Sequence, residues 1–143
     1  MISKTLCGGI AGLVMLAATA PATMAQEAKF KADLTGAQEV PPVTTQAKGT
    51  AEITFDPAAK RLSWNVTYSG LSGPATAAHI HGPAEPGKTA PPYIPFQNAG
   101  VSPITGSATL TDAQVADLNA GRMYVNVHTA ANPGGEIRGQ VTK

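Results

Sequence analysis

The chain has 143 residues, and its ten lysines and arginines almost balance nine aspartates and glutamates. A net charge this close to zero, with no basic run, gives no electrostatic footprint for nucleic acid or an anionic membrane. The one cysteine, Cys7, lies near the start of the chain, which excludes disulfides and thiolate metal sites from the rest of it.

Residues 1–25 predict a signal peptide. An apolar run follows the positive charge of Lys4, and the segment ends at Ala25 in the small-residue pattern of a signal-peptidase site. Cleavage after Ala25 is favoured, and cleavage after Ala22 is the alternative. The apolar run is too short, and too rich in alanine and glycine, for a membrane span. We therefore expect an exported protein, periplasmic or secreted, whose residues 26–143 form a single domain.

The first half of that domain has the alternating pattern of β-strands. Leu62, Trp64 and Val66 alternate with polar residues, and a similar apolar row precedes the turn at Pro57. Strands that alternate in this way have one face buried in the core and one face exposed to solvent. The pattern predicts a hairpin with Trp64 in the core. The strands expected here are residues 29–35, 50–56, 62–68 and 75–81.

The stretch from Gly82 to Gly100 contains five prolines and three glycines when both ends are counted. A long loop without secondary structure of its own is usually functional or disordered. Because this one leaves directly from His81, two interpretations stay open. It either covers a site at that histidine or is a stiff crossover between sheets.

One short helix is expected among the later strands. Thr111 is suited to cap its first turn, and Gln114, three residues on, completes a capping box. Leu118 faces inward, and Gly121 ends the helix. The further strands are residues 104–110, 122–129 and 136–141. Together these elements predict an all-β domain, an antiparallel Greek-key-like sandwich or barrel of about seven to eight strands with one short crossover helix.

The three histidines of the chain all lie on expected strands. His79 and His81 are two residues apart, so their side chains share one face. His128 shares a face with Tyr124 and Asn126, while Val125 and Val127 face the core. A strand-borne His-x-His with one remote histidine is a common transition-metal site in β-proteins, because imidazole suits copper and zinc and a strand fixes its geometry. The alternative is that the histidines are structural.

Copper is favoured over zinc, because the domain is expected to be exported, lacks thiolates and offers an all-imidazole site. Zinc would need water or a carboxylate as a fourth ligand. Glu39 and Glu136 are candidates for an additional metal ligand or for a residue that hydrogen-bonds to a ligand. Their structural alternatives are a local cap for Glu39 and an ion pair between Glu136 and Arg138. No nucleophile elbow or phosphate-binding loop is present, so no catalytic residue is assigned.

Four motifs in order along the chain resemble those of the CHRD domain, and the resemblance covers residues 30–141. That domain is named from chordin, an extracellular antagonist of bone morphogenetic proteins, and it also occurs as a stand-alone exported bacterial domain. The resemblance implies an all-β extracellular domain. The motifs are GAQEVPP at residues 36–42, AHIHG at 78–82, GRMYVNVHT at 121–129 and GGEIRGQ at 134–140.

A weaker similarity is to copper–zinc superoxide dismutase, a Greek-key sandwich that also holds copper with a strand His-x-His and remote histidines. Only His79, His81 and His128 correspond. This chain lacks a fourth histidine for a bridging ligand, a zinc loop and the cysteines of a disulfide. The similarity therefore supports a copper site without implying dismutase activity.

Three functions follow from these observations. The leading hypothesis is an exported, non-enzymatic domain that buffers, carries or senses copper through the three histidines. The alternative is an extracellular protein-interaction or matrix domain with structural histidines and an unidentified protein partner. A mononuclear copper enzyme ranks third, because nothing in the sequence marks a substrate site.

Overall fold

The computed structural model describes residues 24–143. The signal peptide predicted at residues 1–25 lies almost wholly outside the described residues and stays a prediction. Within residues 24–143, no helix combines the length and the apolar character that crossing a membrane requires.

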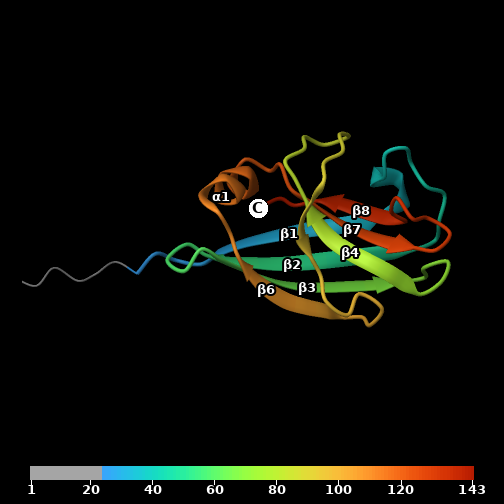
Figure 1. Cartoon of the computed structure of the whole chain (residues 1–143), viewed down its shortest axis with the longest axis horizontal. Coiled ribbons are helices and arrows are strands. Elements are labelled where there is room, and N and C mark those ends of the chain that lie inside the picture. The colour runs from blue at the N-terminus through green and yellow to red at the C-terminus, as the bar shows by residue number, and fades with distance from the viewer. Residues whose placement is uncertain (1–23) are drawn as a thin grey trace, which may run out of the picture.

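The described chain forms one antiparallel sheet of eight strands, curled into a nearly closed barrel (Figure 1). Along the sheet the strands follow the order β5-β4-β7-β8-β1-β2-β3-β6. The all-β class, the strand number and the single helix expected from the sequence are confirmed. The elements are β1 (Ala28–Thr35), η1 (Gly36–Gln38), β2 (Lys48–Asp56), β3 (Arg61–Ser69), β4 (Ala75–His81), β5 (Pro92–Pro95), β6 (Ile104–Thr109), α1 (Asp112–Asn119), β7 (Tyr124–Thr129) and β8 (Ile137–Gln140).

The core lies between two halves of the curled sheet, with β1, β2 and β3 on one side and β4, β7 and β8 on the other (Figure 1). The expected hairpin forms between β2 and β3, where Ile53 is paired with Trp64. Trp64 is only 7% exposed. Its ring stacks on Phe96 with centroids 4.6 Å apart, just beyond the edge strand β5. The predicted core position of Trp64 is confirmed, and Phe96 belongs to the same core.

The proline-rich stretch contains a strand that its composition concealed. Residues Pro92–Pro95 form β5, which pairs only with β4 at one edge of the sheet. Proline lacks an N–H donor, so it is tolerated in an edge strand, where one side needs no partner. The expectation of an unstructured loop over residues 82–100 is therefore wrong for this segment.

The helix ends are as the sequence predicts. Thr111 and Gln114 form the capping box at the start of α1. At its end, Gly121 donates to the carbonyl of Leu118 and Arg122 donates to the carbonyl of Asp117, the two bonds of a Schellman motif. Gly121 has φ +71°, a conformation that costs glycine little.

The outer face of the β4–β7–β8 half is largely buried, whereas simple alternation of apolar and polar residues predicts a solvent-exposed face. Every residue of β7 is buried, so both faces of this strand are covered. We call the outward side chains of these strands the polar face. Three loops cover it, at residues 36–43, 82–91 and 130–135, through the contacts described below. The polar face consists of His79, His81, Tyr124, Asn126, His128, Arg138 and Gln140.

Candidate metal centre

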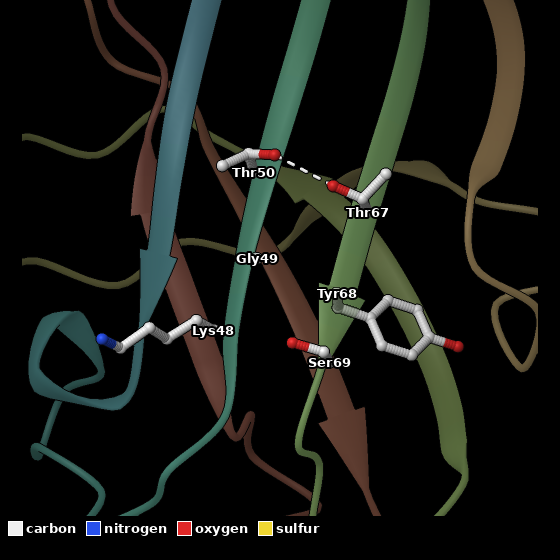
Figure 2. Close-up of a pocket in the computed structure, with 6 residues that line it drawn as sticks. All are labelled: Lys48, Gly49, Thr50, Thr67, Tyr68 and Ser69. Carbon is white, nitrogen blue, oxygen red and sulfur yellow. Dashed lines mark hydrogen bonds between the residues drawn. The ribbon is translucent and has the colours of Figure 1, made fainter.

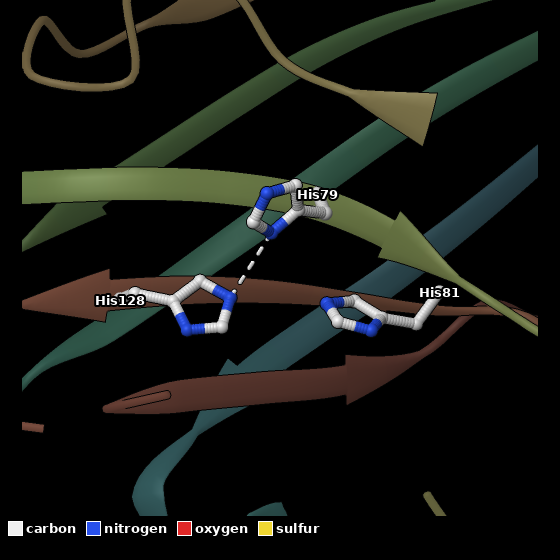
Figure 3. A group of neighbouring side chains, drawn as sticks. All are labelled: His79, His81 and His128. Atoms are coloured by element: carbon white, nitrogen blue, oxygen red, sulfur yellow. Dashed lines mark hydrogen bonds between the residues drawn. The ribbon is translucent and has the colours of Figure 1, made fainter. Parts of the chain in front are cut away.

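Two neighbouring strands bring the histidines together. His79 and His81 project from β4, and His128 projects from β7, which pairs with β4 in antiparallel register. In this register His79 is opposite Asn126, so His128 meets His79 diagonally across the strand pair. The predicted convergence of the three side chains is present in the described residues, and Figure 3 shows their rings turned toward one another.

The ligand nitrogens of the three histidines all lie within 4.8 Å of one another. His79 Nδ1 and His128 Nε2 are the closest, at 3.1 Å. Two imidazole nitrogens bound to one metal ion at about 2.0–2.1 Å lie roughly 3–3.6 Å apart, depending on the angle at the ion. One pair therefore already has the required spacing, and an ion between these two nitrogens would replace their hydrogen bond, with the His79 proton on Nε2 instead of Nδ1.

Backbone carbonyls fix the orientation of two of the rings. His81 Nδ1 lies 2.9 Å from the carbonyl oxygen of Ala90, and His128 Nδ1 lies 3.0 Å from that of Pro133. A carbonyl oxygen only accepts, so both Nδ1 atoms carry the proton and both Nε2 atoms have the lone pair that a metal ion needs. A hydrogen bond behind the ring is the usual arrangement for a metal-binding histidine.

One ring nitrogen of the cluster, Nε2 of His81, lacks a hydrogen-bond partner among the described residues. This atom is also buried. The Nε2 of His128, in contrast, accepts from His79 Nδ1. Buried polar atoms without partners are rare, and one aimed into a histidine cluster indicates a place for an absent partner.

Burial keeps the three imidazoles neutral. It lowers the pKa of His81 to about 4, a fall that the hydrogen bond to Ala90 opposes and that His79, His128 and Arg138 reinforce. Burial also lowers the pKa of His128, and burial together with the charge of His128 lowers that of His79. Neutral imidazole is the form that binds metal, so the cluster needs no deprotonation at neutral pH.

The proline-rich loop covers the His81 side of the cluster. The carbonyl oxygen of Ala90 accepts from the Tyr124 hydroxyl as well as from His81. The Tyr124 ring stacks on the His81 ring, with centroids 4.8 Å apart and planes 8° from parallel. The Arg138 guanidinium lies 3.5 Å from the Tyr124 ring centroid. Of the two interpretations of this loop, covering the histidine site is therefore the one that the contacts favour for residues 88–91.

Glu39 lies beside the polar face, outside the group of three histidines. It is 6% exposed, and its Oε1 has no hydrogen-bond partner among the described residues. Burial raises the pKa of Glu39 to about 7, against the lowering effects of Arg138 and Asn126. A Cβ on Gly135 would lie 2.6 Å from Glu39 Oε1, so only glycine fits beside this carboxyl group.

Glu136 is also placed away from the histidines, and it has a structural role that the sequence did not reveal. It is fully buried, and its carboxylate accepts hydrogen bonds from Thr45, Ser72 and Thr129. Burial alone would raise the pKa of Glu136, but these donors lower it to about 2. The ion pair with Arg138 that the sequence offered as an alternative is not formed among the described residues.

A separate hollow of ≈ 330 Å³ lies on the outside of β2 and β3 (Figure 2). Its most prominent contact is a hydrogen bond of 2.9 Å between the hydroxyl groups of Thr50 and Thr67. Lys48 and Tyr68 flank it. These groups include no cluster of metal ligands and no nucleophile beside a base, so we assign no chemistry to this hollow.

Comparison with known proteins places the chain in a family. The sequence matches the CHRD domain over residues 30–141, which is most of its length. It is 34% identical to chordin of Danio rerio over 116 residues, a match that covers 76% of this chain and 12% of chordin. No solved structure matches. The chain therefore belongs to the CHRD domain family.

Proposed function

We propose that this CHRD domain is an exported copper-binding protein in which His79, His81 and His128 hold one copper ion. Its role would be to buffer, carry or sense the ion. The observation that carries the proposal is the convergence of three neutral imidazoles around the buried, unpartnered Nε2 of His81. Export rests on the signal peptide predicted at residues 1–25.

The donor set favours copper over zinc. The group contains three imidazoles and no carboxylate or thiolate among the described residues. Structural zinc sites almost always have four protein ligands, whereas copper accepts imidazole readily and lies above zinc in the Irving–Williams order. The lowered pKa values of the histidines leave the ligands available for a divalent or monovalent ion without releasing protons.

A non-enzymatic role is favoured by what surrounds the cluster. The Ala90 and Pro133 carbonyls and the Tyr124 ring close it on two sides. Five cavities of residues 24–143 are lined by other side chains, and none of the three histidines lines one of those five. A site built to hold an ion needs no substrate cavity beside it.

Calorimetric titration of Cu(II) and Zn(II) into protein purified without a metal-binding tag tests the proposal. We expect one copper per chain, tighter binding of copper than of zinc, and loss of most of the affinity in each of H79A, H81A and H128A. Ile80→Val is the control, because Ile80 is fully buried on the core side of β4 between the two ligands. Equally weak binding by all five proteins would remove the site and leave the protein-interaction domain as the better explanation.

A further inference from the structure

A second cavity lies on the polar side of the sheet but is separate from the histidines. Its volume is ≈ 380 Å³, which is within the range of sites for small molecules. It opens between the segment around η1 and the tip of the proline-rich loop, over the end of β8. Its lining residues are Ala37, Gln38, Glu39, Val40, Pro42, Pro86, Gly87, Arg138 and Gln140.

Arg138 is the unusual feature of this cavity. Arg138 is only 2% exposed, yet it forms no ion pair with a carboxylate of the described residues. Its Nη2 donates to the carbonyl oxygen of Lys88 at 2.6 Å, and its guanidinium lies on the Tyr124 ring. These contacts hold the guanidinium in place without neutralising it. A buried charge is normally paired, because desolvation of an unpaired charge is costly.

The acidic side chain that shares the cavity does not form an ion pair with Arg138. Glu39 lines the same cavity, but its buried Oε1 has no hydrogen-bond partner among residues 24–143, and it forms no ion pair with Arg138. The other polar side chains of the wall bond to the protein instead. Gln38 Nε2 donates to the Asp33 carbonyl, and Gln140 Nε2 donates to the carbonyls of Ala84 and Gly121. The cavity therefore keeps one buried, fixed positive group that has no ion pair, and Glu39 acts on it only through the electrostatic effect of a nearby carboxyl group.

The remaining wall determines what kind of anion fits. Val40, Pro42 and Pro86 make much of it apolar, and Val40 is 42% exposed. A guanidinium presents a planar fork of donors that matches a carboxylate. We propose that this cavity binds a small organic acid, with its carboxylate on Arg138 and its hydrocarbon body against the valine and the prolines.

The test uses benzoate, acetate and inorganic phosphate as probes of EDTA-treated protein, so that its outcome does not depend on the metal site. Binding is followed by NMR through the side-chain N–H signals of Arg138 and Gln140. We expect saturable shifts with benzoate and weaker binding of acetate, which lacks the hydrocarbon body. Phosphate should bind more weakly than benzoate, because it gains nothing from the apolar wall.

Two variants with matched controls decide the site. Arg138→Gln should weaken benzoate binding by about tenfold or more, because a charge-assisted hydrogen bond is lost. Arg61→Gln removes the same charge from an exposed position and should leave binding unchanged. Should R138Q fail to fold, Ala37→Trp fills the cavity from an exposed position and should abolish binding. Ala59→Trp, in the exposed β2–β3 turn, is its control.

Three results would overturn the proposal: no saturable benzoate shift in the wild-type protein, unchanged affinity in folded R138Q or A37W, or tighter binding of phosphate than of benzoate. The last would indicate a general oxyanion site. Loss of copper binding in the histidine variants with benzoate binding retained would confirm that the two sites are independent.

Discussion

His79 Nδ1 lies 3.1 Å from His128 Nε2, although the two residues are not paired across the strands. In the register of β4 and β7, His79 is opposite Asn126 and His128 is opposite Ala77. The contact depends on the diagonal reach of the two rings and on the Pro133 carbonyl that orients His128. The loop after β7 is therefore as much a part of the candidate metal centre as the strands.

Copper binding should persist to lower pH than it would for histidines with ordinary pKa values. At about pH 5.5, an imidazole with a pKa of about 6.5 is roughly one-tenth neutral, so three of them would lose up to about a thousandfold in affinity. Burial lowers the pKa of all three ligands, that of His81 to about 4. His81 therefore stays neutral at about pH 5.5, and titrations at about pH 7.5 and 5.5 should differ by less than about a hundredfold. A loss near a thousandfold would show that the rings are solvated in solution.

Glu136→Gln should destabilise the fold, because four hydrogen bonds to a buried carboxylate are weakened or lost. We expect the free energy of unfolding to fall by roughly 2–4 kcal/mol, as measured by urea denaturation at neutral pH. Glu52→Gln, at an exposed position of β2, is the control and should change stability little.

The same carboxylate should contribute to acid denaturation. Its pKa is about 2 in the folded protein against 4.5 as the ordinary value, so the unfolded chain binds a proton first as the pH falls. The stabilisation from Glu136 is therefore complete above about pH 4.5 and is lost as the pH falls toward 2. Wild-type protein should lose stability across this window by more than E136Q does, and parallel losses in the two proteins would contradict the assignment.

Trp64→Ala should cost about 3–5 kcal/mol of unfolding free energy, because it leaves a cavity beneath Phe96. Chemical denaturation followed by circular dichroism measures this. Thr67→Ala on the outer face of the same strand should have a small effect. A Trp64 variant as stable as the Thr67 variant would mean that the stacked pair is not formed in solution.

Gly121→Val should destabilise the domain by roughly 1–2 kcal/mol through the backbone alone. A Cβ at this position meets no atom within 4 Å, so the cost comes from φ +71°. Gly73→Val is the matched control, because Gly73 also has open space but no positive φ. Thermal unfolding should separate the two variants, and equal melting temperatures would show that the left-handed conformation does not hold.

The sequence by itself determined the features that depend on local periodicity. Alternation placed Trp64 in the core and set His79 and His81 on one face, because successive strand side chains point to opposite sides. The capping box at Thr111 and the glycine at position 121 fixed both ends of α1, since each rests on hydrogen bonds within a few residues. These signals need no knowledge of what packs against them.

Only the tertiary structure decided which side chains surround the histidines. β5 was hidden because prolines suppress the strand signal, and its edge position became visible only with its pairing to β4. The four hydrogen bonds to Glu136 and the contact of Lys88 with Arg138 join segments between 7 and 91 residues apart. No local pattern encodes such contacts. Loops cover the face that alternation predicts to be solvent-exposed, and the resulting burial lowers the pKa values of the three histidines.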